Sequence, residues 1–460
     1  MKKILAMTLA LVTVLSLCAC GAGGEKKPEG LQIGYSRQSI MPDGPVGMAG
    51  YTDHTTRKSE GYLDIVYTTC IAFTEGDETV LVYTEDLAGK GQAATKNARD
   101  AITEATGIPG NRIVFANTHT HSGPSLFNNT YGIDQYRNIY YGAVVQAAQE
   151  ALADRSSAEI YGAKVQTEGL NFVRHYIEFD GDYTSQNNGN FVLEDTKGHA
   201  READPEMVLL KLDRADESKK DILMMNWAAH PTRTDEYNLL SADYVGSART
   251  SFEDQTGMLF AFFQGAGGDV VTESAIPSLR NKLDRITYGE ALAKVAVEAL
   301  PNMQKIEGTG VHMSQNVLTC GTNTYGLDRL EEAKNLLDMP NANSELARAH
   351  GFCSISECRG IVNSAKREPT QDMELDAISV GGVAFTTASW EMFSDTGKYI
   401  KEQSPYEYTM VFSCANGKGS YIPTAEAYEY PCYELFVAEF EKGSAEKAAD
   451  ALIDMLKSFQ

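Results

Sequence analysis

The stretch from Val80 to Pro124 reads VLVYTEDLAGKGQAATKNARDAITEATGIPGNRIVFANTHTHSGP and decides the fold. Residues 80–84 are an apolar run typical of a buried strand, residues 92–106 have the period of an amphipathic helix, and residues 112–116 are a second apolar run. This order predicts a βαβ unit with parallel strands. Because ligands of α/β folds gather at the carboxyl ends of such strands, residues 117–124 fall where a site is expected.

The rest of the sequence also alternates between predicted strands and predicted helices. Residues 207–212 and 222–228 predict a hairpin, and further strands are expected at 258–263, 374–380, 383–388 and 409–413. Helices are expected at 244–254, at 288–299, at 327–350 as a possible lid, and over the last sixteen residues. The sequence has no internal repeat and no low-complexity linker after residue 30. It therefore predicts one domain over residues 31–460, of α/β (mixed α+β) class, with mixed and parallel sheets flanked by helices and a metal site at strand ends.

The first thirty residues differ in kind. Lys2 and Lys3 precede an apolar run, residues 4–17, that is too short for a stable membrane span and is typical of an export signal. The run ends in LCACG, which resembles the lipobox of bacterial lipoproteins with Cys20 as the acylated residue. We therefore expect a lipoprotein signal peptide at 1–19, a flexible tether at 20–30, and anchoring by lipid to the outer face of the bacterial cytoplasmic membrane. An ordinary signal peptide with two chance cysteines is the alternative.

Composition narrows the class of protein. With 43% hydrophobic and 22% charged residues in 460, the chain can bury a large core. Its formal net charge of −23 argues against nucleic acid or anionic lipid headgroups as partners. The six cysteines after Cys20 show no CxxC spacing. Cys353 and Cys358 are the pair best placed by proximity for a disulfide.

Three histidines suggest metal chemistry. His119 and His121 stand at a strand end, where alternate side chains face the same side and could converge on one ligand, and His230 follows a second strand. For any single histidine the alternative is an ordinary hydrogen-bonding group in the core. The HExxH, GxSxG, GxxxxGK[ST] and GxGxxG signatures are absent, which disfavours standard zincins, α/β-hydrolases and P-loop enzymes. Zinc suits imidazole nitrogen combined with carboxylate or phenolate oxygen.

Several short motifs occur in an order that resembles the neutral/alkaline non-lysosomal ceramidases. They are MAGY at 48–51, NTHTHSGP at 117–124, AHPT at 229–232, AFFQ at 261–264 with GDV at 268–270, and ANG at 415–417 with YIPT at 421–424. The THTHSGP run is the most specific, and the resemblance covers roughly residues 31–435.

The resemblance implies a zinc ion held by His119, His230, Glu391 and Tyr421. It also implies that His121 and Arg174 bind or protonate the substrate. A surface glutamate that opens a helix and a packing tyrosine are the alternatives for Glu391 and Tyr421.

Two departures from the family pattern bear on mechanism. The family carries a serine in the strand-end loop, often proposed as nucleophile, where this sequence aligns Gly265; Thr272 or Ser274 could replace it. The family's C-terminal β-sandwich has no counterpart in the sequence, which ends at Gln460.

The resemblance implies a zinc-dependent amidohydrolase that cleaves an N-acyl amide such as ceramide with metal-activated water. The alternatives are a zinc amidase or esterase acting on another small-molecule or lipid substrate, and a surface lipoprotein that binds a ligand without catalysis.

Overall fold

The structure, a computed structural model, describes residues 30–51, 56–188, 191–417 and 419–460. The signal peptide and nearly all of the tether expected at the N-terminus, including Cys20, lie outside these residues. Within them, no helix combines the length and apolar character needed to span a membrane.

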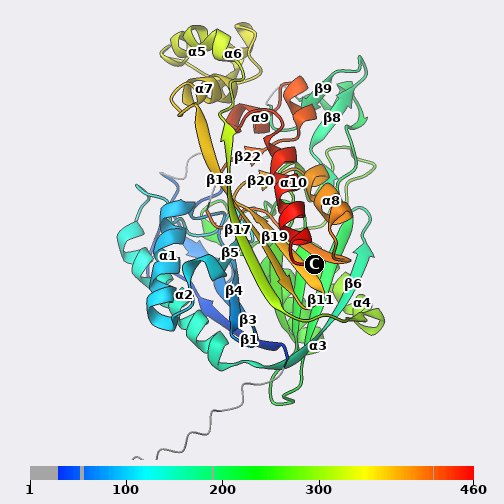
Figure 1. Cartoon of the computed structure of the whole chain (residues 1–460). Helices are drawn as coiled ribbons and strands as arrows, with labels where there is room; N and C mark the ends of the chain where they lie inside the picture. Colours follow the sequence, from blue (N-terminus) through cyan, green and yellow to red (C-terminus); the bar gives the residue numbers. More distant parts are fainter. Residues whose placement is uncertain (1–29, 52–55, 189–190, 418) are drawn as a thin grey trace, which may run out of the picture.

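A nine-stranded mixed sheet forms the centre of the molecule (Figure 1). Its strand order is β14 (Leu259–Gln264), β12 (Ile222–Trp227), β11 (Glu206–Arg214), β6 (Ser156–Gln166), β1 (Gln32–Ser39), β3 (Tyr67–Glu75), β4 (Glu78–Glu85) and β5 (Ile113–Asn117), with β16 (Gln304–Ile306) also paired to β6. The β4–β5 and β12–β14 pairs are parallel, and the other pairs are antiparallel. The predicted βαβ unit and the predicted β11–β12 hairpin are both confirmed.

A four-stranded sheet packs face to face on this sheet. It consists of β17 (Val311–Gly321), β18 (Thr370–Val380), β19 (Val383–Ala388) and β21 (Tyr408–Phe412). Apolar side chains from the two inner faces form the largest buried cluster. Within it the rings of Phe263 and Phe412 stack with centroids 4.4 Å apart. Removing these faces from water is what holds the two sheets together.

Helices cover both outer faces of this pair of sheets (Figure 1). One set covers the nine-stranded sheet: α1 (Gly91–Thr106), α2 (Ile133–Ala153), α3 (Tyr244–Thr256) and α4 (Arg285–Ala299). α8 (Ser394–Gln403) and α10 (Ser444–Lys457) cover the four-stranded sheet. α10 buries Ala445, Ala448 and Leu452 on one face, the spacing that the sequence predicted for the last helix. The predicted mixed α+β class is confirmed.

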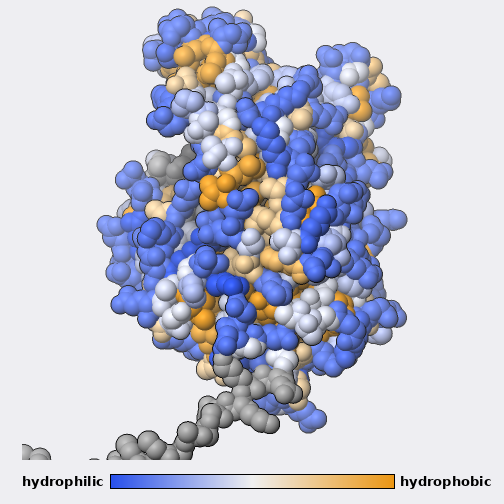
Figure 2. All heavy atoms as spheres, in the orientation of Figure 1, coloured by the Kyte–Doolittle hydropathy of each residue, from blue (hydrophilic) through white to orange (hydrophobic). Residues whose placement is uncertain are grey.

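The region predicted as a helical lid forms an extension at the end of β17 and β18 (Figure 1). It contains α5 (Leu330–Leu337) and α6 (Ser344–Ala349), and also α7 (Ile355–Ser364), which the sequence analysis missed. Hydrophobic side chains show between hydrophilic ones on this extension in Figure 2, and further hydrophobic residues lie along the middle of the same face, flanked by hydrophilic ones. Cys353 and Cys358 are both free, because Cys358 faces the small apolar core of the extension, so the disulfide considered for them does not form.

Short elements gather where the long strands end. They are β2 (Gly61–Tyr62), β13 (Leu239–Leu240), β7 (Phe172–Val173), β15 (Val270–Val271), β8 (His175–Glu178), β9 (Tyr183–Ser185), β10 (Thr196–His199), β20 (Glu391–Met392), β22 (Tyr421–Ile422) and α9 (Tyr433–Val437). Glu391, Tyr421, His175 and Glu434, described next, lie on these short elements.

Candidate metal centre

Loops that follow β5, β12, β14, β19 and β21 meet at one place. Backbone hydrogen bonds join them: Ser413 N donates to Gln264 O at 3.0 Å, and Gly268 N donates to Met392 O at 2.8 Å. A Cβ at Gly268 would lie 2.5 Å from Glu391 O, so only glycine permits this approach. The loops that follow these strands therefore lie together, as expected, and a site there stays a prediction.

His119 is held in an uncommon backbone conformation. Its φ is 66°, in the left-handed region that non-glycine residues rarely adopt and that is frequent at functional sites. The backbone N–H donates to Leu87 O at 3.0 Å, and ring atom Nδ1 lies 2.8 Å from Ala88 O. β5 ends at Asn117, so the alternation of a strand no longer applies at residues 119 and 121. The rings of His119 and His121 converge as expected. A left-handed turn brings them together, and the alternation of side chains along a strand is not the cause.

His230 is held in a similar way. Its Nδ1 lies 3.0 Å from Val270 O, and its backbone N–H donates to the same oxygen at 3.0 Å. A carbonyl oxygen can only accept, so Nδ1 of both His119 and His230 must carry the proton. In a neutral ring the Nε2 atom then has a free lone pair, and this is the arrangement that orients metal-binding histidines.

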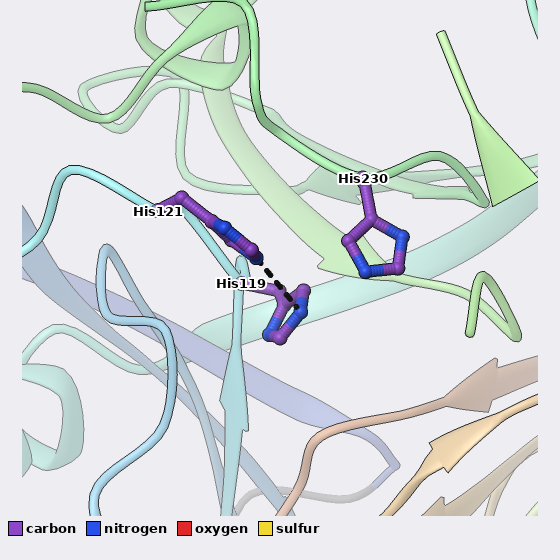
Figure 3. A group of neighbouring side chains, drawn as sticks. All are labelled: His119, His121 and His230. Atoms are coloured by element: carbon purple, nitrogen blue, oxygen red, sulfur yellow. Dashed lines mark hydrogen bonds between the residues drawn. The ribbon is translucent and has the colours of Figure 1, made fainter. Parts of the chain in front are cut away.

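The free nitrogens point to a common centre, and Figure 3 shows the three rings that surround it. His119 Nε2 lies 3.4 Å from His121 Nε2 and 3.4 Å from Glu391 Oε2. His230 Nε2 lies 3.2 Å from the same carboxylate oxygen. His119, His230 and Glu391 are buried, whereas His121 is partly exposed.

The charges at the centre are strongly coupled. Burial tends to raise the pKa of Glu391, but the imidazoles of His119 and His230 hold that pKa well below its ordinary value. Burial and the nearby Arg174 guanidinium lower the pKa of His230. The Glu391 carboxylate therefore stays ionised, and the lowered pKa of His230 keeps that imidazole neutral, so together they supply negative charge and a lone pair for a divalent cation.

The donor set fits zinc. The three imidazole nitrogens lie within 4.8 Å of one another, and a carboxylate oxygen closes the group. Neutral imidazole and carboxylate are the ligands zinc prefers in catalytic sites, and each of the two buried rings already has a carbonyl partner on its far nitrogen.

Tyr421 and Glu391 are neighbours across a short parallel pair, β20 with β22. The Tyr421 ring stacks on His230 with centroids 6.5 Å apart, and its hydroxyl accepts a hydrogen bond from Arg174 Nη2 at 3.1 Å. Burial and the charge of Glu391 raise the pKa of Tyr421, while Arg174 opposes them. All four residues expected as ligands thus lie in one neighbourhood, with Tyr421 adjoining the other three.

Arg174 is buried, and its hydrogen bonds go to protein groups. Nε donates to Glu434 Oε1 at 2.6 Å and Nη2 donates to Gly268 O at 2.9 Å, in addition to the bond to Tyr421. These contacts give it a role in holding Tyr421 and the Gly268 loop. The substrate contact expected for Arg174 stays a prediction.

Glu434 is a residue the sequence analysis missed. Its second carboxylate oxygen lies 3.0 Å from His175 Nε2, and His175 Nδ1 lies 2.9 Å from Tyr430 OH. Cys432 lies close enough to complete a second set of possible metal donors. Because the Arg174 guanidinium already pairs with Glu434, a cation would be repelled there. We interpret this set as a buried network that fixes Arg174. No spacing in the sequence links residues 174, 175 and 434.

The hydroxyl groups considered as nucleophiles are buried. A Cβ at Gly265 would meet Ala228 Cβ at 3.0 Å, so a side chain at this position would press against the end of β12. Ser274 is fully buried and its Oγ lies 2.7 Å from His199 Nε2. Thr272 is also buried. The strand-end loop contacts the centre through the Val270 carbonyl instead.

Comparison with solved structures shows a neutral ceramidase-like fold. The crystal structure of neutral ceramidase from Pseudomonas aeruginosa superposes with a TM-score of 0.69 at 16% sequence identity, covering 94% of this chain and 75% of that chain. A structure described as ceramidase complexed with C2 gives a TM-score of 0.70 at 15% identity, with the same coverage. No protein-family model matches the sequence. No curated protein matches it either.

Proposed function

We propose that this protein is a zinc-dependent amidohydrolase that cleaves an N-acyl amide of the ceramide type. The observation that carries the proposal is the convergence of the Nε2 lone pairs of His119 and His230 on Glu391 Oε2, at 3.4 and 3.2 Å. Burial tends to lower the pKa of His119, but Cys414 and Glu391 raise that pKa well above its ordinary value, so the centre attracts positive charge. Either a cation or a second proton on His119 must lie among these buried acceptors. The similarity of fold to neutral ceramidases, one of them a complex described with C2, supports the choice of reaction and a lipid substrate.

In this proposal His119, His230, Glu391 and Tyr421 hold the zinc. A bound zinc ion polarises a carbonyl and makes water available as a nucleophile near neutral pH. The Ala88 and Val270 carbonyls keep the two histidines in the tautomer that binds metal. The Arg174 guanidinium at 3.1 Å from the Tyr421 hydroxyl favours the phenolate.

His121 is the proton-transfer group in this proposal. It is the partly exposed member of the three histidines, and its Nε2 faces the centre at 3.4 Å from His119 Nε2. From this position Nε2 can hold a proton at the substrate carbonyl or pass it to the leaving nitrogen. General acid–base groups of this kind contribute about 10² to 10⁴ in rate.

Metal analysis and kinetics of three variants test the proposal. We expect one zinc per chain, hydrolysis of N-acyl amides that a chelator abolishes and zinc restores, and loss of both metal and activity in His230→Ala. His121→Ala should keep the zinc and lose about 10² to 10⁴ in kcat/KM. His350, exposed at the end of α6, provides the matched control His350→Ala, which should behave as wild type.

The outcomes separate the alternatives. Zinc loss in His121→Ala would place His121 among the ligands in place of Tyr421. Hydrolysis of esters or other amides, but not of N-acyl sphingoid bases, would favour a zinc amidase or esterase with another substrate. Absence of zinc from the wild-type protein would refute the proposal.

A further inference from the structure

Lys90 is a fully buried lysine just before α1. Its Nζ lies 2.5 Å from Glu85 Oε2, 2.7 Å from the Tyr140 hydroxyl, and 3.2 Å from the centroid of the Phe115 ring. Both side chains of the Lys90–Glu85 ion pair have zero exposure. Lysine and glutamate are almost never fully buried, because taking two charges out of water costs as much as their attraction returns. Stability alone is therefore a weak reason for such a pair.

The loop between Glu85 and Lys90 supports His119. Glu85 O accepts a hydrogen bond from Thr118 N at 2.8 Å, and Leu87 O accepts one from His119 N at 3.0 Å. Ala88 O accepts the bond from His119 Nδ1 at 2.8 Å. Three carbonyls of this one loop thus hold the left-handed turn and the ring tautomer of His119.

The ion pair joins the two ends of that loop. Glu85 is the last residue of β4, and Lys90 directly precedes α1. The Glu85 carboxylate also accepts from the Tyr140 hydroxyl at 2.8 Å and from Thr68 Oγ1 at 3.2 Å, so both of its oxygens are occupied. Tyr140 lies on α2, so the Lys90–Glu85 ion pair connects the sheet to both α1 and α2.

The charge on Lys90 persists at neutral pH. Burial lowers the pKa of Lys90 to about 8, with the Glu85 carboxylate acting in the opposite direction. The ammonium therefore remains protonated near pH 7, and the ion pair is present under ordinary conditions.

We propose that Lys90 is a positioning residue for His119. Its ion pair with Glu85 fixes the loop that aims the Ala88 carbonyl at Nδ1, which keeps the Nε2 lone pair directed at the metal centre. The inference rests on the proposed function, in which His119 binds zinc. It adds a group, remote from the substrate, that acts through the Ala88 carbonyl.

The test is the double variant Glu85→Gln/Lys90→Met, which removes both charges and nearly preserves side-chain volume. Partners that orient a ligating histidine typically contribute 10- to 100-fold in metal affinity, so zinc measured by competition with a chromophoric chelator should bind at least tenfold more weakly. Tyr140→Phe removes only the hydroxyl shared by the pair and should give a smaller loss in the same direction. It serves as the variant to measure if the double variant does not fold.

A second ion pair is the control for a purely structural effect. Arg214 and Asp154 form an ion pair near the start of β12, whereas His230 follows the other end of that strand. The Arg214 side chain is buried. Asp154→Asn/Arg214→Met should lower the melting temperature and leave zinc affinity unchanged. Equal zinc affinities for the Glu85/Lys90 double variant, Tyr140→Phe and wild type would overturn the inference.

A metal-independent measurement separates this inference from the proposed function. In protein labelled with ¹⁵N-histidine, the His119 Nδ1–H signal, assigned by its loss in His119→Gln, should exchange slowly with water in wild type. It should exchange at least tenfold faster in the double variant. If wild type binds no zinc, the proposed function fails, and this exchange rate still decides the positioning role. Unchanged exchange in a folded variant would refute it.

Discussion

Replacing Gly50 by alanine tests the catalytic role of His121 without changing His121. Gly50 has a φ of +114°, and a Cβ there would lie 2.5 Å from His121 Cα and 2.7 Å from its Cβ. Carbon atoms in contact need about 3.5 to 4.0 Å, so one of the two segments must move by about 1 Å. Misplacing a catalytic group by about 1 Å can cost about 10² in rate. We therefore expect kcat/KM for an N-acyl amide to fall about 100-fold in Gly50→Ala.

Zinc content distinguishes this effect from damage to the metal site. His121 is outside the proposed ligand set, so Gly50→Ala should retain one zinc per chain. The added strain and overpacking should cost about 1 to 3 kcal/mol of stability, visible as a lower melting temperature. Gly44→Ala is the matched control, since a Cβ at Gly44 meets nothing within 4 Å and should change neither rate nor stability. A folded Gly50→Ala protein with wild-type kcat/KM would refute the catalytic role of His121, and zinc loss would assign it as a ligand.

Three further predictions concern other parts of the molecule. We propose that activated water attacks the substrate directly, without an acyl-enzyme. An activated ester should then release no initial burst of product equal to the enzyme concentration, and Ser122→Ala should lose little activity. An acyl group trapped on Ser122, Thr272 or Ser274 would contradict this mechanism. Burial and Glu374 raise the pKa of Asp376 to about 6 from 3.8, with Arg99 opposing. The folded state therefore binds the proton more tightly, and ionised Asp376 lowers stability above pH 6 but not below pH 4. The difference in free energy of unfolding between Asp376→Asn and wild type should therefore rise by about 2 kcal/mol in favour of the variant from pH 4 to pH 7. Urea unfolding measures this difference, and the same difference at both pH values would show that the pKa of Asp376 is not raised. We also propose that the protein is anchored by lipid on Cys20, so wild type should partition with membranes and Cys20→Ala should not; soluble secretion of wild type by a host with lipoprotein processing would rule this out.

Local sequence determined the elements. The apolar run at 80–84, the helical period at 92–106 and the apolar run at 112–116 became β4, α1 and β5 with ends within two residues of those predicted. Such patterns succeed because burial of one face requires a fixed period along the chain. The same reasoning placed His119, His230 and the Gly268 loop at strand ends, since polar residues that follow buried strands must emerge at a sheet edge.

Tertiary structure alone decided how these residues meet. The left-handed turn at His119 depends on carbonyls of the loop 85–90, and the bond from Arg174 to Glu434 joins residues 260 positions apart. The Lys90–Glu85 pair is close in sequence, yet its burial depends on Tyr140 from α2. No period or spacing encodes such contacts, because they arise only when packed sheets and helices exclude water and leave each buried polar group to find a partner.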